Sequence, residues 1–152
     1  MINLVVVGKL KEKAMQAISD EFEMRIQPYH KLKITELKDF TNSGSIDAIA
    51  KEAELIKKQI KDRDFVIVLD LDGKDITSPQ LAEKIDDAFL NHGSNISFII
   101  GGSMGLCPTI KARANYRWKL SSLTFTHQFA RMIVLEQVYR AFKILANEPY
   151  HK

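Results

Sequence analysis

Hydrophobic residues gather along the chain in short segments that favour β-strands. Residues 2–7 (INLVVV), 65–71 (FVIVLDL) and 95–100 (NISFII) are mostly apolar and rich in β-branched residues, a pattern typical of strands buried on both faces. Residues 32–37 (LKITEL) alternate between apolar and polar, which predicts a strand with one exposed face. Residues 118–125 (WKLSSLTF) predict a fifth strand that passes into a loop.

Between these segments, apolar residues recur every three or four positions, which is the period of an amphipathic helix. Pro79 suits the first position of such a helix, because its missing N–H has no helical partner there. Asparagine, serine and glycine at 42–45 predict a loop. The predicted helices cover residues 10–27, 46–61, 78–91 and 127–146, with a further short one opening at Pro108.

Strands and helices therefore alternate along the whole chain. This order predicts an α/β fold, a single domain over residues 1–152 with a mostly parallel sheet and helices on both faces. Such sheets bind ligands beyond the carboxyl ends of their strands. We therefore expect a site in the loops that follow Leu69, Ile100 and Leu120.

The last predicted helix carries more apolar side chains than one buried face requires. A helix that is apolar nearly all round is buried on more than one side. In a chain of this size a second subunit is a natural partner for the surplus face, which predicts a homodimer. The residues concerned are Phe129, Met132, Ile133, Val134, Leu135, Val138, Tyr139, Phe142, Ile144 and Leu145.

Composition limits the class of protein. Cys107 is the only cysteine, so no disulfide forms within the chain and a reducing compartment is expected. No run approaches the roughly 20 apolar residues of a membrane helix, so we expect a cytoplasmic protein with no membrane partner. The net charge of +3 is compatible with RNA binding but does not single it out. The four histidines show no ligand spacing, so no metal site is expected.

The loop at 101–105 (GGSMG) holds three of the seven glycines. Its spacing differs from the G-x-G-x-x-G dinucleotide motif, and no Gly-Lys-Ser/Thr follows as in a Walker loop. Two interpretations stay open. The backbone could contact a flat ring of a ligand, or two chain segments could pack closely at a turn.

The loop at 68–74 (VLDLDGK) contains Asp70 and Asp72. A D-x-D-G sequence after an apolar strand is typical of phosphatases that form an aspartyl-phosphate. Such a motif normally lies on the first strand, however, and no acidic magnesium pair follows a later strand here. The alternative interpretation is a tight turn with two solvated aspartates.

The loop at 120–126 leads into the last helix, which we expect to begin near Thr126. Helix N-termini favour anions such as a carboxylate. His127 is then either a cap-region histidine or a catalytic base. Cys107, before Pro108, is either a thiolate at a helix start or a packing residue, and the absence of an ordered base favours packing.

Several stretches together resemble the bacterial large-subunit rRNA pseudouridine methyltransferases of the SPOUT superfamily, the RlmH family. The stretches follow one another over nearly the whole chain, and their combination is far more specific than any one of them. They are VVVGKLKEK (5–13), LDLDGK (69–74), FIIGGSMGL (98–106), LSSLTFTHQFAR (120–131), LEQVYRAFKI (135–144) and EPYHK (148–152).

The resemblance implies a homodimer whose C-terminal part is threaded into a deep trefoil knot. It implies S-adenosylmethionine as the cofactor and a pseudouridine of 23S ribosomal RNA, methylated at N3, as the substrate. Thr126 stands where the family commonly has proline, and its hydroxyl is still expected to cap the helix. Carried onto this sequence, the cofactor contacts are Leu69, Gly101, Leu120, Ser121, Ser122, Leu123, Thr124 and Phe125.

The candidate catalytic residues are Glu136, Arg140, Tyr150 and His151. Glu136 and Arg140 are four positions apart on one helix face, which equally fits an ordinary ion pair. A chain end is usually frayed, whereas the resemblance implies a tail folded over the partner's cofactor pocket. We expect His151, ahead of Glu136, to take a proton and Tyr150 to stack on a base, with Lys152 or Arg140 holding phosphate.

Two functions without catalysis stay open. A nucleotide-binding regulator would respond to ATP or NAD. A dimeric RNA-binding module would need no cofactor and would use the basic residues Lys9, Lys11, Lys13, Arg25, Lys31 and Lys33.

Overall fold

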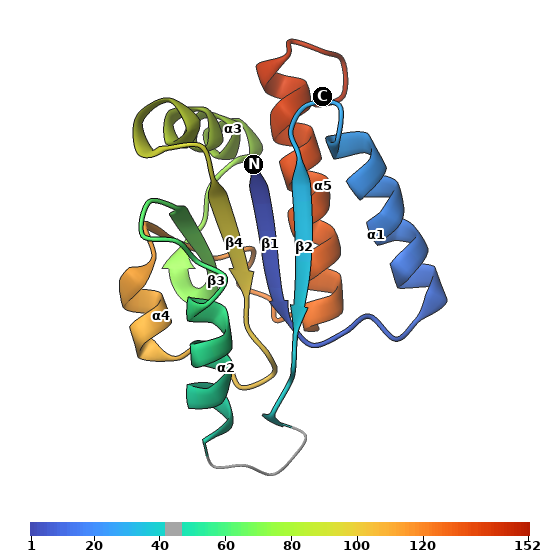
Figure 1. Cartoon of the computed structure of the whole chain (residues 1–152). Helices are drawn as coiled ribbons and strands as arrows, with labels where there is room; N and C mark the ends of the chain where they lie inside the picture. The colour runs from blue at the N-terminus through green and yellow to red at the C-terminus, as the bar shows by residue number, and fades with distance from the viewer. Residues whose placement is uncertain (42–46) are drawn as a thin grey trace.

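The computed structural model describes residues 1–41 and 47–152, in which five parallel strands form one sheet (Figure 1). The order is β2-β1-β4-β3-β5, and every neighbouring pair runs parallel. β1 and β4 lie inside the sheet and are buried along their whole lengths, as their apolar runs predict. The strands are β1 (Ile2–Val7), β2 (Leu32–Leu37), β3 (Phe65–Lys74), β4 (Ile96–Ile100) and β5 (Tyr116–Trp118).

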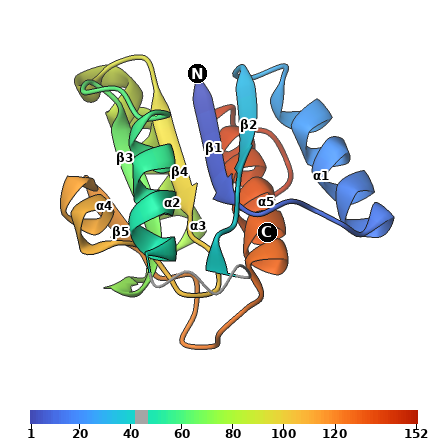
Figure 2. The same cartoon turned by 60° about the horizontal axis from the view of Figure 1, so that its bottom comes forward.

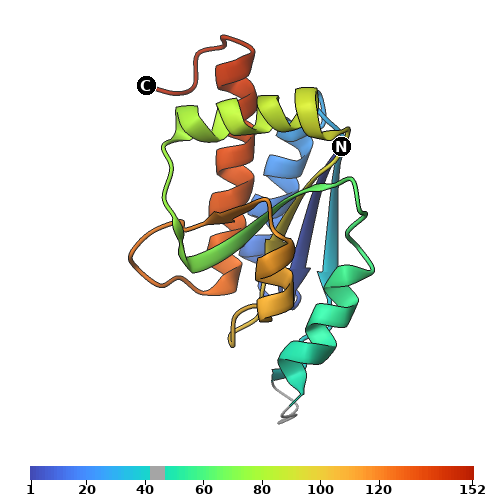
Figure 3. The same ribbon diagram turned by 90° about the vertical axis from the view of Figure 1, so that its left-hand side faces the viewer.

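Helices cover both faces of the sheet, which confirms the predicted layers (Figure 3). One face packs against α1, α3 and α5, and the other packs against α2 and α4. A single π-helical turn, Ala88–His92, extends α3 toward β4. The helices are α1 (Lys13–Ile26), α2 (Ala48–Lys57), α3 (Ser78–Asp87), α4 (Pro108–Arg113) and α5 (His127–Leu145).

α5 packs against both α1 and α3 and buries side chains along most of its length. These neighbours and the sheet take up most of the apolar surface that suggested a second subunit. The exceptions are Phe129 near the start of the helix, which is 56% exposed, and Leu145 at its end, which is 37% exposed. The homodimer therefore stays a prediction.

β3 differs from its prediction, because it continues to Lys74 through the segment expected to form a turn. Leu69 and Lys74 both pair with Trp118, so the residues between them bulge out of the ladder with β5. The bulge explains Gly73, since a Cβ at this position would lie 2.4 Å from the carbonyl oxygen of Arg117.

Other boundaries shift by a few residues. β5 spans Tyr116–Trp118, so the strand that the sequence predicts at the start of 118–125 begins two residues earlier and ends at Trp118, and the loop follows at once. α1 begins at Lys13 rather than at residue 10. The predicted loop at 42–45 lies outside the described residues. Within residues 1–41 and 47–152, no helix is long and apolar enough to span a membrane. The trefoil knot stays a prediction.

Candidate active site

The three candidate loops leave the sheet at one edge. β4, β3 and β5 are neighbours, and parallel strands place their carboxyl ends together. Figure 2 brings this edge forward and shows the loop before α5 projecting from it. Leu69, Gly101 and the segment 120–125 therefore all belong to the same side of the molecule.

Gly101 occupies a place where the chain leaves no room for a side chain. A Cβ there would lie 2.9 Å from Cδ2 of Leu106 and 3.0 Å from the carbonyl oxygen of Gly105. The amide of Gly105 donates to the carbonyl of Gly102 at 3.0 Å, and Gly105 has a φ of +80°. The close packing that the sequence left open is thus present, and cofactor contact at Gly101 stays a prediction.

The segment 120–125 is irregular and mostly exposed. The hydroxyl of Ser121 accepts a hydrogen bond from the amide of Leu123 at 3.0 Å, which closes a small turn. Leu123 is 68% exposed and Phe125 is 38% exposed. This segment therefore presents both hydroxyl groups and apolar surface beside the carboxyl edge.

α5 begins as predicted, because the hydroxyl of Thr126 accepts the amide of Phe129 at 3.3 Å and caps the helix. His127 is the first residue of α5 and is half-buried. A Cβ built on Gly8 would lie 3.3 Å from Nε2 of His127, so the ring packs against the backbone that follows β1. This position is that of a cap-region histidine.

Asp70 lies in the bulge of β3 and is buried rather than solvated. Its carboxylate pairs with Arg117 at 2.7 Å and Lys111 at 3.3 Å, and it accepts the amide of Asp72 at 3.1 Å. Burial opposes ionisation, but these donors outweigh it and lower the pKa of Asp70. Two cations thus engage the carboxylate that a phosphatase would use as nucleophile, and the prediction of two solvated aspartates is wrong for Asp70.

Cys107 precedes α4 and is half-buried. Its sulfur lies 3.3 Å from the hydroxyl of Thr109, and this hydrogen bond lowers the pKa of the Cys107 thiol. No histidine or carboxylate forms a hydrogen bond with it among the described residues. In the same part of the chain, no group of three or more His, Cys, Asp or Glu residues could hold a metal ion.

The four candidate catalytic residues meet on one side of α5. Arg140 Nε donates to Oε1 of Glu136 at 3.0 Å, and the hydroxyl of Tyr150 donates to the same oxygen at 3.2 Å. Arg140 also lies 4.7 Å from the ring centre of Tyr150 and places Nη1 3.3 Å from Nδ1 of His151. The ion pair between Glu136 and Arg140 is therefore part of the cluster that also includes Tyr150 and His151.

Electrostatics stabilises the charged state of this cluster. Its hydrogen bond to the Glu136 carboxylate raises the pKa of Arg140. Burial is the main cause that raises the pKa of Tyr150, and the negative charge of Glu136 adds to it. At neutral pH the cluster thus combines an ion pair with a neutral phenol.

The tail that carries Tyr150 is ordered, contrary to the usual behaviour of a chain end. Asn147 has a φ of 54° and ends α5 in a Schellman motif, with its amide bonded to Ile144 at 3.0 Å. The amide of Glu148 bonds to the carbonyl of Lys143 at 2.9 Å and completes the motif. The tail is therefore turned back along the helix.

Three side chains that sequence reasoning missed anchor this turn. The hydroxyl of Tyr29 donates to Oε2 of Glu148 at 2.8 Å, and Lys143 pairs with the same oxygen. The Tyr150 ring also packs edge-on against Tyr139, with ring centres 4.9 Å apart. The only sequence signal was Asn147 just after the helix, since asparagine tolerates the left-handed conformation. The Tyr29 contact joins residues far apart in the sequence.

A family model described as "Predicted SPOUT methyltransferase" matches residues 1–151. The chain belongs to this family. Two relatives of this SPOUT methyltransferase are each named Ribosomal RNA large subunit methyltransferase H, one from Clostridium botulinum (strain Hall) and one from Bifidobacterium adolescentis. Each is 48% identical to the chain, and each alignment covers 99% of both proteins.

Two solved structures share the fold of the SPOUT methyltransferase. One is a probable methylase family protein from Haemophilus influenzae, with a TM-score of 0.58, 16% identity and coverage of 99% of this chain and 70% of that one. The other is a tRNA (m1G37) methyltransferase from Aquifex aeolicus, with a TM-score of 0.60, 13% identity and coverage of 99% and 74%.

Within one chain of the SPOUT methyltransferase, the two sets of candidate site residues lie apart. The cofactor candidates stand at the carboxyl edge of the sheet, next to the start of α5. Glu136 lies ten residues beyond Thr126, which is about 15 Å along the helix. In Figure 1 the C terminus lies at the end of the molecule opposite the strand arrowheads. The single chain therefore does not bring the two sets together.

Proposed function

We propose that the protein transfers a methyl group from S-adenosylmethionine to N3 of a pseudouridine in 23S ribosomal RNA of the large subunit. The observation that carries this proposal is the 48% identity over 99% of the chain to proteins named Ribosomal RNA large subunit methyltransferase H. An enzyme with this substrate works where ribosomes are, which places it in the cytoplasm.

The carboxyl edge of the sheet suits the proposed cofactor. Exposed Leu123 and Phe125 and the bare backbone at Gly101 can contact a flat purine. S-adenosylmethionine would supply a methyl group already activated on a sulfonium. The residues that would hold it are Leu69, Gly101, Leu120, Ser121, Ser122, Leu123, Thr124 and Phe125.

A homodimer completes this site. The tail cluster and the cofactor loops stand at different ends of α5, so a partner's tail must cover each cofactor pocket. Large exposed apolar side chains around the carboxyl edge and the start of α5 support a contact there, because a monomer leaves them in water. They are Leu71 (59% exposed), Met104 (66%), Leu123 (68%) and Phe129 (56%).

The cluster geometry favours His151 over Glu136 as the group that takes the N3 proton. Glu136 accepts hydrogen bonds from Arg140, Tyr150 and Gln137, so its carboxylate is engaged on both oxygens. The side chain of His151 is exposed, and its one hydrogen-bond contact with the described residues is to Arg140. A guanidinium has no lone pair, so Nδ1 accepts there, and proton uptake at Nδ1 requires His151 to leave Arg140.

The function is tested by incubating the purified protein with labelled S-adenosylmethionine and ribosomes from a strain that lacks the modification. We expect one label per large subunit, on N3 of one pseudouridine, as located by mass spectrometry of RNA digests. Label on transfer RNA, or no transfer to ribosomes or large subunits despite cofactor binding, would overturn the proposal.

A further inference from the structure

A groove of about 510 Å³ lies beside the carboxyl ends of β1 and β2, at the edge that Figure 2 brings forward. None of the candidate cofactor residues lines it. It lies between the residues that follow β1, those that follow β2 and the first turn of α5. The lining residues that matter here are Gly8, Lys9, Lys11, Lys38, Asp39 and His127.

Charge in the groove is predominantly positive. Lys9 and Lys11 make no ion pair with any residue in 1–41 or 47–152. Lys38 lies 4.9 Å from the ring centre of Phe40. Asp39 is the one lining carboxylate, and the hydrogen bond from the Thr41 hydroxyl lowers its pKa, so it stays ionised at neutral pH. Three ammonium groups thus face one carboxylate.

The start of α5 adds N–H groups to this charge. Thr126 caps the amide of Phe129, but the amides of His127 and Gln128 have no partner among the described residues. In a helix of 19 residues, these groups carry the positive end of the helix dipole. Both residues line the groove, so its wall already offers donors to an anion.

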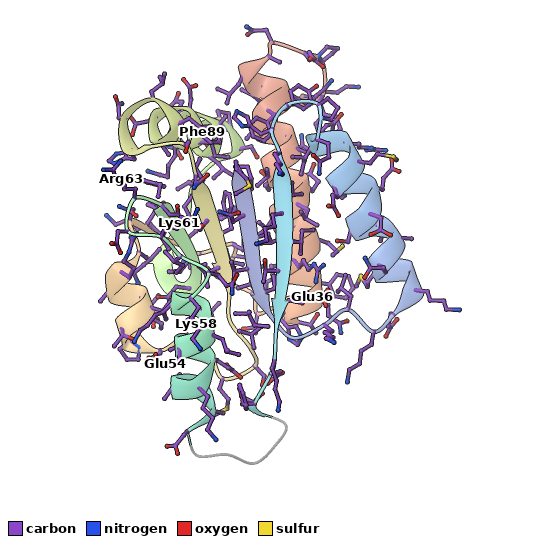
Figure 4. All side chains as sticks on the ribbon, viewed as in Figure 1. Glu36, Glu54, Lys58, Lys61, Arg63 and Phe89 are labelled. Atoms are coloured by element: carbon purple, nitrogen blue, oxygen red, sulfur yellow. The ribbon has the colours of Figure 1, made fainter. Side chains whose placement is uncertain are left out.

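Arg131 adds a buried guanidinium beside the groove, held by Glu36 and Ser19. Its side chain is 5% exposed, and Nε has no hydrogen-bond partner although Nη1 pairs with Glu36 at 2.8 Å. Figure 4 labels Glu36 near the carboxyl end of β2. Arg131 lines a cavity of about 10 Å³ that shares Gly8, Lys9, His127 and Gln128 with the groove. A buried guanidinium with a free N–H therefore lies next to the unpaired amides.

We propose that this groove binds the sugar–phosphate backbone of the RNA substrate next to the nucleotide that receives the methyl group. The inference rests on the proposed function. S-adenosylmethionine carries one carboxylate and no phosphate, so it does not account for several lysines along one groove, whereas RNA supplies a row of phosphates. The segment 120–125 leads into the first turn of α5, and this turn lines the groove. A phosphate bound in the groove would therefore hold the RNA strand beside the methyl donor.

The test compares two double variants that remove equal charge. In the groove variant, Lys9→Gln and Lys11→Gln are combined. In the control, Lys58→Gln and Lys61→Gln remove two exposed lysines of the segment between α2 and β3, which does not line the groove (Figure 4). For each we would measure binding of unmodified large ribosomal subunits over a salt series, together with kcat, KM and calorimetric cofactor affinity.

We expect the groove variant to bind large subunits about tenfold more weakly, with a salt slope shallower by about 2, one for each phosphate contact. KM should rise in parallel, with cofactor affinity and thermal stability unchanged. Replacement of both lysines by arginine should restore binding. The control variant should behave as the wild type.

Equal loss in both variants, or a change confined to cofactor affinity or kcat, would overturn the groove assignment. Failure of the wild type to methylate any large subunit would instead overturn the proposed function. The binding measurement does not depend on turnover, so it tests the groove in either case.

Discussion

The two ends of α5 differ in how completely their polar groups are engaged. At its C-terminal half, Glu136, Arg140, Tyr150 and His151 contact one another, and the Schellman motif holds the tail. At its start, two helix amides lack partners in the described chain, and large apolar side chains lie in water. One end is preorganised, and the other leaves helix amides unpaired and apolar side chains exposed. In the proposed homodimer, each chain would supply both halves of a site, one from each end of α5.

The largest effect is expected in the cofactor loops near the start of α5, where Gly101→Val should abolish cofactor binding. The new side chain would push against Leu106 and the Gly105 carbonyl and distort the loop, at a cost of about 1–3 kcal/mol in stability. Calorimetry with S-adenosylmethionine measures the loss, and a thermal melt shows whether the protein remains folded. Gly105→Asn is the control, because its Cβ meets no atom within 4 Å and asparagine tolerates positive φ. Unchanged affinity in Gly101→Val would remove Gly101 from the pocket.

Removal of residues 150–152 should disrupt only the cluster at the C-terminal half of α5. We expect the single-turnover rate of methyl transfer to fall by about 100- to 10,000-fold, the range for loss of a general base and its positioning. Cofactor affinity should be unchanged, since the cofactor loops are elsewhere. Single-turnover methyl transfer to ribosomes is the measurement, with deletion of Lys152 only as the control. Full activity without these residues would exclude the tail from catalysis.

The next effect concerns Asp70, the buried carboxylate in the bulge of β3. Asp70→Asn should destabilise the protein at pH 7 by about 1–3 kcal/mol, because Lys111 and Arg117 lose their shared anion. The folded pKa lies below the ordinary value of 3.8, so the contribution is complete above that value and is lost as pH falls through the folded pKa. Urea unfolding at several pH values should show the gap to wild type closing in acid. Asp72→Asn, at an exposed position, should show no such gap.

The smallest effect concerns the turn at the ordered end. Asn147→Val should cost about 1–2 kcal/mol, because a β-branched residue is strained at a φ of 54°. Asn147→Gly should be close to neutral. Urea unfolding gives the stabilities, and kcat should fall with Val but hold with Gly. Equal stability of both variants would show that the turn does not anchor the tail.

Periodicity predicted the fold because the apolar pattern of each strand and helix reflects which of its faces is buried. INLVVV and NISFII become the two fully buried inner strands, and the amphipathic segments cover both faces. The strand order could not be predicted this way, since it depends on which segments meet in space. The DGK sequence predicted a turn because its residues favour turns. Pairing with Trp118 instead draws Lys74 into the sheet.

The same distinction, between contacts of sequence neighbours and contacts of distant residues, applies to the candidate site. The cap by Thr126 and the pair of Glu136 with Arg140 depend on neighbours three or four residues away, so local spacing could predict them. The bond from Tyr29 to Glu148 joins residues 119 positions apart, and no local pattern signals it. The burial of Asp70 likewise depends on Lys111 and Arg117, which come from a later part of the chain.

The place of β1 inside the sheet has a consequence for the order in which the chain folds. Ile2 pairs with Leu32 on one side and with Ile96 on the other. During synthesis one edge of INLVVV therefore stays unpaired until β4 has emerged, and this edge combines high β-propensity with no charge. Parallel pairing over such separations is also slow to form. Aggregation of nascent chains should consequently start at this strand. Lysine or proline insertions that block its free edge should then reduce the aggregation.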